Sequence, residues 1–414
     1  MILETYLKNN NKNLHQMHLE TAIPETTLRN LNKREIDKWN IEYFDALAKT
    51  VGKEKMTVIT ELEDLSNQTI NGANHENYLG RYNLENRRYI GDKNRLVNWI
   101  AELIDTHTSG NSFLDLFAGT GVVSKKMMPK YDSIILNDFL YSNNIIYNAF
   151  FGTSPYNIEK ILNYQDTFKR ITSNTIDDDY FVTNYGNKFF SDHDARIIGE
   201  IRTRIEKNKK LNNRERSILI ASLIYSVDKI ANTVGHYDAY RKKVKIKDKF
   251  VFELINPLNV DGKNIKIYRK NANDLVKQIK SHVVFIDPPY NSRQYSRFYH
   301  VLEGIAKWDK PHLTGVAMKP PVENMSEYSK VSAHQAFDDL IIHLNAKYIV
   351  VTYNNTYNSK SNSSKNKITH EQILESLNKV GHTKSFEMPF QFFNAGKTEL
   401  KDHKEFVFIT EVIK

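Results

Sequence analysis

Five short apolar runs, each followed by a helical pattern, constrain the fold of this 414-residue chain more than any other feature. They read SFLDLF (112–117), SIILND (133–138), KIYRK (266–270), HVVFID (282–287) and KYIVVTYN (347–354). Runs rich in β-branched and aromatic residues that alternate with helical patterns predict parallel strands joined by crossover helices. We therefore expect an α/β fold. A last segment, 390–410, reads as two strands around a Gly-Lys turn and predicts a hairpin at one edge of the sheet.

The α/β pattern occupies only part of the chain. Residues 1–66 have apolar positions three and four apart and predict an all-helical domain, and the Asn-rich residues 67–80 predict a linker. Helical and strongly basic sequence interrupts the alternation at 146–261. We expect an inserted domain there, between a first part of the core, 81–145, and a second part, 262–414.

Composition limits the chemistry and the partners of the chain. It has no cysteine, which excludes thiolate nucleophiles and cysteine-ligated zinc or iron–sulfur clusters. A net charge of +9 favours a polyanionic partner, although a basic surface can also serve solubility alone. No apolar run is long enough to cross a bilayer, and the N-terminal residues lack the features of a secretory signal. We expect a cytoplasmic protein without membrane contact.

A glycine-containing turn follows the first predicted strand. In FLDLFAGTGVVSKK, Asp115, Gly119 and Gly121 lie where strand gives way to helix, at the edge of an α/β sheet where ligands bind. Ser124 replaces the third glycine of the dinucleotide fingerprint, which weakens a nicotinamide or flavin interpretation. Asp138 ends the next strand, at the spacing that suits hydrogen bonds to ribose hydroxyls. The pair outlines a pocket for a nucleoside-bearing cofactor; a tight turn and a helix cap are the alternatives.

The stretch VVFIDPPYNSRQYSRFYH places an acid, two prolines and a tyrosine at the end of the fourth predicted strand. Pro288 and Pro289 restrict the backbone, so that the Asp287 carboxylate and a carbonyl can converge on one amino group. Two acceptors would favour the pyramidal geometry in which an aromatic amine can attack, and Tyr290 offers a face for base stacking. An ordinary Asp-Pro turn would explain the prolines but not the whole set. After the third strand, Asp274 could reach an adenine amino group or cap a helix.

These motifs resemble the adenine-specific, S-adenosylmethionine-dependent DNA methyltransferases whose signature is Asp-Pro-Pro-Tyr. The resemblance covers roughly residues 85–414 and implies a Rossmann-like methyltransferase sheet in which the inserted segment recognises the target. It implies S-adenosylmethionine as the cofactor and a catalytic role for Asp287, Pro288, Pro289 and Tyr290. The residues that match the cofactor motifs are Tyr89, Gly91, Lys93, Asp115, Phe117, Gly119, Gly121, Asp138 and Asp274.

The resemblance also implies a mechanism. The target adenine would be flipped from the duplex, held through its amino group by Asp287 and the Pro288 carbonyl, and methylated by direct in-line displacement without a metal. The lack of cysteine excludes methylation of cytosine at ring carbon five, which needs a thiolate. Methylation of the cytosine amino group uses the same logic and stays open.

Basic residues outside these motifs are candidates for nucleic-acid contacts. Some follow the signature and others lie in the inserted segment, where a solvated basic face is the alternative. By contrast, Tyr299, Leu302 and Ile305 have helical spacing and favour packing. The candidate phosphate contacts are Arg241, Lys242, Lys243, Arg293 and Arg297.

Near the N-terminus, LETAIPETTLRNL resembles the helix-turn-helix of phage-repressor-like regulators. PETTLRNL would be the recognition helix, with Thr26, Thr27 and Arg29 directed to DNA. Ala22 stands where the turn usually carries glycine, so a helical module that binds protein, or nothing, is the alternative.

Together the motifs predict a site-specific methyltransferase acting on the amino group of adenine in double-stranded DNA. A restriction-modification system is the expected setting, with a cognate restriction endonuclease as a candidate partner. Two other hypotheses stay open: an adenine methyltransferase that acts on RNA, and a catalytically inactive DNA-binding regulator. Neither the target sequence nor the oligomeric state follows from the motifs.

Overall fold

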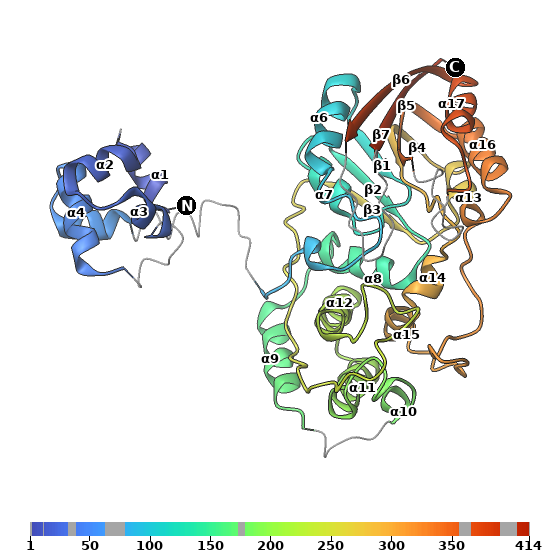
Figure 1. Ribbon diagram of the computed structural model, residues 1–414, viewed down its shortest axis with the longest axis horizontal. Coiled ribbons are helices and arrows are strands. Elements are labelled where there is room, and N and C mark those ends of the chain that lie inside the picture. The colour runs from blue at the N-terminus through green and yellow to red at the C-terminus, as the bar shows by residue number, and fades with distance from the viewer. Residues whose placement is uncertain are drawn as a thin grey trace. The chain divides into compact units, whose positions relative to one another are not determined.

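The computed structural model describes residues 2–10, 12–31, 39–62, 79–172, 179–355, 366–389 and 404–413. The chain divides into two compact units, residues 1–77 and 78–414 (Figure 1). All but the last two residues of the linker predicted at 67–80 lie outside the described residues. The same holds for the turn and the first strand of the predicted C-terminal hairpin, since 390–403 are not described.

The first unit is helical throughout its described residues. It contains α1 (Ile2–Asn9), α2 (Leu14–Thr21), α3 (Glu25–Leu31) and α4 (Ile41–Val51), with further helix at 55–62. A capping box begins α2, because the Asn13 side chain accepts the Gln16 N–H while the Gln16 side chain accepts the Asn13 N–H. The helix ends at Ala22, whose φ of 58° is left-handed, so the turn adopts the conformation for which glycine is usual.

The second unit is built on a seven-stranded sheet of order β3-β2-β1-β4-β5-β7-β6. The strands are β1 (Ser112–Asp115), β2 (Ser133–Asn137), β3 (Asn264–Tyr268), β4 (Lys280–Ile286), β5 (Asn345–Asn354), β6 (Gly381–Pro389) and β7 (Lys404–Val412). Strands β1 to β5 pair in parallel, whereas β7 is antiparallel to both β5 and β6. The predicted α/β class is confirmed, and all five apolar runs contribute parallel strands.

Helices cover both faces of the sheet (Figure 1). Those on one face are α6 (Val97–His107), α7 (Val122–Met127) and α8 (Tyr141–Phe150), and those on the other are α13 (Ala272–Val276), α16 (Ala333–His343) and α17 (His370–Asn378). Neighbouring strand residues point into opposite cores: Phe113 into the first, Leu114 into the second. Burial of both faces explains why the strand runs are apolar almost throughout. Among the described residues, no helix combines the length and the apolar character needed to cross a bilayer.

The helical segment between β2 and β3 shares the first of these cores. It contains α9 (Ile158–Lys169), α10 (Tyr180–Tyr185), α11 (Asp192–Lys207) and α12 (Asn213–Ile230). Ile161, Ile198 and Ile224 belong to the same apolar cluster as Phe113 of β1. The boundary predicted at 146 falls inside α8, so the segment continues from a crossover helix, on which α12 packs.

Candidate active site

A cavity of about 350 Å³ opens at the carboxyl ends of β1, β2, β3 and β4. From β1 the chain continues to β2 and β3 on one side and then crosses to β4 on the other side of β1. Ligands of open α/β sheets bind where the strand order reverses in this way. The volume lies in the range of small-molecule sites. Among its lining residues are the predicted Tyr89, Gly91, Lys93, Asp115, Phe117, Gly119, Asp138, Asp274, Asp287 and Pro289. Gly121, Pro288 and Tyr290 do not line it.

Both carboxylate oxygens of Asp287 have partners. The Thr352 hydroxyl donates to Oδ1 over 2.7 Å, and Lys93 Nζ lies 2.8 Å from Oδ2. Burial lowers the pKa of Lys93, but the charges of Asp287 and Glu405 together raise it by more. The pKa of Lys93 therefore lies above its ordinary value. Lys93 is therefore a cation at neutral pH, and with Thr352 it fixes the orientation of Asp287 at the cavity wall.

Tyr290 lies in the core. Its ring is 7% exposed and packs edge-on against Tyr353, with 4.9 Å between centroids. Its backbone carbonyl accepts the Lys367 N–H over 2.6 Å. Stacking of Tyr290 on a base would therefore require this ring to leave its packing. The aromatic residues that line the cavity are Tyr89, Phe117, Phe139, Phe285, Tyr295 and Tyr328.

Asp115 presents a buried acceptor at the cavity. The residue is 1% exposed, and Ser124 Oγ donates to Oδ2 over 2.7 Å. Within the described part of the chain, Oδ1 has no hydrogen-bond partner. Burial raises the pKa of Asp115 to about 7, against a lowering by the Ser124 hydrogen bond. Buried polar atoms are nearly always paired, so this orphaned oxygen is suited to a donor on a ligand.

Asp138 and the glycines hold the turn between β1 and α7. Asp138 Oδ2 accepts the Gly119 N–H over 3.0 Å, and Oδ1 accepts the Leu140 N–H over 2.9 Å. Both Gly119 and Gly121 have left-handed φ angles, 53° and 81°. A Cβ on Gly119 would also lie 3.2 Å from the Tyr89 ring. Ribose binding by Asp138 stays a prediction, and it would use the lone pairs that these amides leave.

Two tyrosines that follow the Asp-Pro-Pro-Tyr signature form hydrogen bonds to the segment that contains Tyr89 and Gly91. The Ile90 N–H donates to Tyr299 Oη over 2.8 Å, and Tyr295 Oη donates to the Ile90 carbonyl over 2.9 Å. The Tyr89 ring stacks on the Tyr299 ring, with 4.9 Å between centroids and 7° between planes. The start of α14 (Tyr295–Phe298) thus joins the loop of the Asp-Pro-Pro-Tyr signature to the segment that carries Lys93.

Tyr299→Phe and Tyr295→Phe should each weaken binding at the cavity. Each variant keeps the ring but removes one hydrogen bond to Ile90, worth about 0.5–1.5 kcal/mol, or about two- to tenfold in the dissociation constant. Titration calorimetry with the cofactor measures the effect. Tyr180→Phe is the control, because it removes a similar bond to the Pro311 carbonyl outside the cavity. Equal weakening in the control would mean that the tyrosines act only through general stability.

Residues 89–368, more than half of the chain, match the family model of D12 class N6 adenine-specific DNA methyltransferases. The chain belongs to this family. The matched segment begins at Tyr89 and contains the glycine turn, the Asp-Pro-Pro-Tyr signature and the helical segment between β2 and β3.

Three curated relatives carry methylase or methyltransferase names, which is consistent with this family. Modification methylase LlaI of Lactococcus lactis subsp. lactis is 34% identical over 65% of this chain and 46% of its own length. Type II methyltransferase M.NlaIII of Neisseria lactamica is 28% identical over 76% of this chain and 95% of its own length. Type II methyltransferase M.FokI of Planomicrobium okeanokoites is 31% identical over 78% of this chain and 52% of its own length. The chain thus spans about half of two of these proteins and nearly all of the third.

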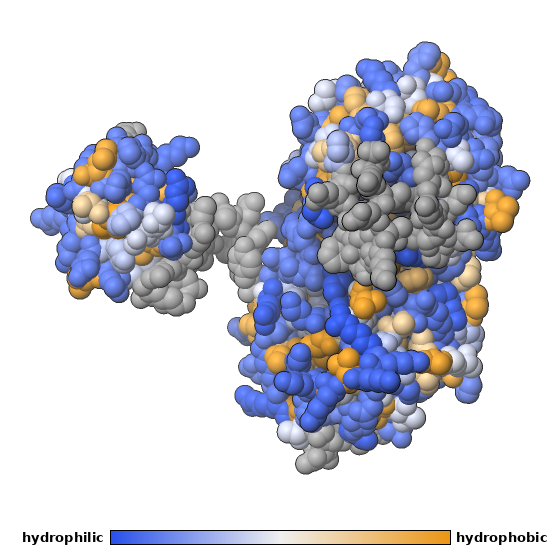
Figure 2. Space-filling view, in the orientation of Figure 1, coloured by the Kyte–Doolittle hydropathy of each residue, from blue (hydrophilic) through white to orange (hydrophobic). Residues whose placement is uncertain are grey.

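The candidate phosphate contacts of this D12 family member lie in two places. Arg241, Lys242 and Lys243 begin an exposed irregular segment that runs to residue 249. Near the signature, Arg297 donates to the Pro320 carbonyl over 2.6 Å, and the Arg293 guanidinium lies 5.8 Å from the Phe298 ring centroid. Figure 2 shows hydrophilic residues over most of the visible face of the larger unit, with smaller apolar patches among them.

The predicted recognition helix, α3, has a buried and an exposed side. Leu28 and Leu31 are buried, whereas Thr26 and Arg29 are exposed and Thr27 is intermediate. Arg29 pairs with Glu25, N to O 3.4 Å. Residues 1–77 carry 12 acidic and 9 basic side chains, so this unit has no excess of positive charge to attract DNA. DNA contact by this unit stays a prediction.

Three residues near the cavity were not predicted from the sequence. Thr352 orients Asp287, and Gln294 bonds both backbone groups of Ser326, accepting the N–H over 2.7 Å and donating to the carbonyl over 2.9 Å. Glu405 is a buried acid at the start of β7. The polar residues at the end of the run KYIVVTYN indicate in the sequence that Thr352 could reach the site. The position of Glu405 near the cavity, by contrast, depends on the pairing of β7 with β5.

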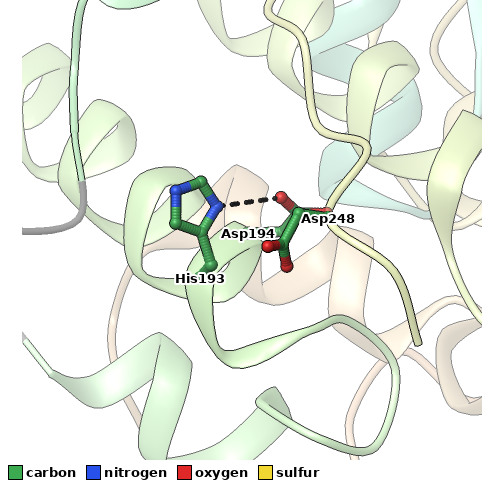
Figure 3. A group of neighbouring side chains, drawn as sticks. All are labelled: His193, Asp194 and Asp248. Atoms are coloured by element: carbon green, nitrogen blue, oxygen red, sulfur yellow. Dashed lines mark hydrogen bonds and ion pairs between the residues drawn. The ribbon is translucent and has the colours of Figure 1, made fainter. Parts of the chain in front are cut away.

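Another group of ionisable side chains lies at the start of α11. Ligand atoms of His193, Asp194 and Asp248 lie within 4.8 Å of one another (Figure 3). Asp194 Oδ2 accepts the N–H groups of Lys249, over 2.8 Å, and Phe250, over 3.2 Å. Asp194 therefore fastens α11 to the exposed basic segment.

Proposed function

We propose that the chain is a site-specific DNA methyltransferase that modifies the exocyclic amino group of adenine in double-stranded DNA. One observation carries the proposal: Asp287, oriented by Thr352 and Lys93, shares a cavity with the glycine turn and the orphaned acceptor of Asp115. Membership of an N6 adenine-specific family supports adenine over cytosine as the target.

S-adenosylmethionine would supply the methyl group as a sulfonium when bound. The residues present fit a cationic, nucleoside-bearing ligand, because Asp115 offers an unpaired buried oxygen and Asp274 is an exposed acid on the cavity wall. Tyr89, Gly91, Phe117, Gly119 and Asp138 would complete this part of the site.

The chain's own contribution to the reaction would be positioning. Asp287 and the Pro288 carbonyl would each accept one hydrogen of the target amino group, which directs the nitrogen lone pair away from both acceptors. Thr352 holds the carboxylate in one orientation, so the acceptor is already placed when the amino group arrives. The target base would enter the cavity extrahelically and contact its aromatic rings.

The basic segment at 241–249 would bind phosphates. We expect the double variant Lys242→Ala/Lys243→Ala to weaken DNA binding and to lower the slope of log affinity against log salt by about 1.8, since each lost phosphate contact removes about 0.9. Fluorescence anisotropy over a salt series measures this slope. Lys280→Ala/Lys384→Ala is the control, because it removes two exposed cations from strands of the sheet. An unchanged slope in the first variant would remove the segment from the DNA interface.

The setting we propose is a cytoplasmic restriction-modification system with a cognate restriction endonuclease. The names of the relatives, modification methylases and type II methyltransferases, support this setting.

The proposal is tested with the full chain and labelled S-adenosylmethionine, offered duplex DNA and structured RNA in parallel. Transfer to the adenine amino group of DNA is the expected result, and sequencing of modified bases in DNA from expressing cells would then give the target sequence. Transfer to RNA alone, to cytosine alone, or to no nucleic acid would contradict the proposal.

A further inference from the structure

Glu405 is a buried acid for which the mechanism above has no use. It is 6% exposed and lies opposite Asn354 in the antiparallel pairing of β7 with β5. Directly opposed residues share a face of the sheet, and so do residues two apart on one strand. Glu405, Asn354 and Thr352 therefore lie on the same face, and Thr352 is the residue that donates to Asp287.

A chain of hydrogen bonds joins Glu405 to the catalytic loop. Asn354 bonds the Glu405 carboxylate through its side chain, and Asn366 Nδ2 donates to the Asn354 side chain over 3.2 Å. Asn366 in turn forms an antiparallel bridge with Asn291, next to the signature. The carboxylate is thus held beside the catalytic loop by two strands and a loop.

Lys93 is the cation that the two acids share. Its ammonium is 2.8 Å from Asp287 and its pKa is raised by both carboxyl groups. Burial raises the pKa of Glu405 to about 7, the charge of Lys93 lowers it, and that of Asp287 raises it. The other groups that face Glu405 are Tyr290, whose pKa is raised by burial and by both acids, and the uncharged Asn354 and Met388 of the neighbouring strands.

The Asp287 carboxylate already has a cationic partner in Lys93. In the structure its Oδ2 is paired with Lys93, yet in the proposed function the same carboxylate accepts the target amino group. A buried ammonium without a partner is strongly unfavourable, so Lys93 can leave Asp287 only if another anion receives it.

We propose that Glu405 is a positioning residue that offers Lys93 a second ionic partner, so that Asp287 is released to the target amino group. This inference rests on the proposed function. When Lys93 moves, a protonated Glu405 gives its proton to solvent and becomes the carboxylate that pairs with the ammonium. Below about pH 7 this loss becomes unfavourable, so kcat at saturating cofactor should fall by about tenfold per pH unit.

The test is Glu405→Gln, which keeps the shape of the side chain and removes its charge. At pH 8 and saturating cofactor and DNA, kcat should fall by about tenfold, the factor that one pKa unit represents. The variant should also lose the fall in kcat between pH 8 and pH 6, with the KM for the cofactor unchanged. Glu405→Asp, which keeps the charge, should restore the pH dependence. Glu411→Gln, an exposed acid on the same strand, is the control and should match the wild type.

A second readout does not need activity. A carboxyl group whose pKa is higher in the folded than in the unfolded protein stabilises the folded state at pH values below its pKa in the unfolded protein. For Glu405 this stabilisation is lost as pH rises through about 7. The Tm of Glu405→Gln relative to the wild type should therefore rise between pH 5 and pH 8.

The outcomes separate the inference from the function on which it rests. A wild type that methylates DNA, with Glu405→Gln retaining its kcat and pH dependence, would overturn the inference and leave the function intact. A Tm difference that does not change with pH would overturn it as well. A wild type without methyl transfer would instead reject the proposed function.

Discussion

Asp287→Ala is expected to lower kcat for methyl transfer by about 100- to 1000-fold or more, the cost of removing one preorganised polar group from a reacting centre. The carboxylate is the acceptor at the end of β4 that Thr352 and Lys93 orient, and alanine leaves only a backbone carbonyl to hold the amino group. Cofactor binding should remain largely intact. Single-turnover transfer of labelled methyl groups and calorimetry with the cofactor measure the two effects separately.

The matched control is Asp261→Ala. Asp261 is exposed and precedes β3, so the same charge is removed at the amino end of the sheet, away from the cavity. Full methyl transfer by Asp287→Ala would remove the proposed site. Equal loss in both variants would point to instability, which the Tm of each variant would show.

The parallel sheet was predictable because burial on both faces leaves a strong signal. The central predicted strands are mostly apolar, and alternate residues such as Phe113 and Leu114 fill two different cores. Once the strands are parallel, their carboxyl ends meet, so Asp115, Asp138 and Asp287 converge from local sequence alone. Helical spacing likewise predicted packing for Tyr299, Leu302 and Ile305, each 0% exposed.

The partners of these acids were not predictable, because they come from segments far apart in the chain. Lys93 precedes Asp287 in the sequence and Thr352 follows it, yet both contact its carboxylate. Glu405 is brought near by the antiparallel pairing of β7 with β5. The orientation of the Tyr290 ring depends on Tyr353, a residue of another strand. Motifs identify which side chains reach the cavity, but their hydrogen bonds depend on tertiary packing.

The limits of the inserted segment are hard to read from the sequence for a related reason. A helix that packs on the sheet and a helix that packs on another helix show the same apolar period, so periodicity cannot separate two domains that share a core. The apolar cluster that contains Ile161 and Ile224 also contains Phe113 of the sheet. Variants in α9 or α12 should therefore be read as changes to the core that also contains the sheet.

Asp115→Asn is expected to weaken binding of S-adenosylmethionine at pH 8 by about 10- to 150-fold, the equivalent of about 1.5–3 kcal/mol for a hydrogen bond to a charged group. The buried Oδ1 of Asp115 is unpaired in the described part of the chain, so an ionised Asp115 gains most from a cationic ligand. Calorimetry of cofactor binding without DNA measures this loss independently of the chemistry at Asp287.

The pH dependence of binding distinguishes charge from shape at Asp115. Burial raises its pKa to about 7, so protonation competes with a cationic ligand below that pH, and wild-type affinity should fall by up to about tenfold per pH unit. Asp115→Asn should show no such fall. Ser124→Ala removes the hydrogen bond that lowers the Asp115 pKa, so the fall should begin at a higher pH in that variant. Wild-type affinity that is constant between pH 6 and pH 8 would show that Asp115 does not bind the cofactor as a carboxylate.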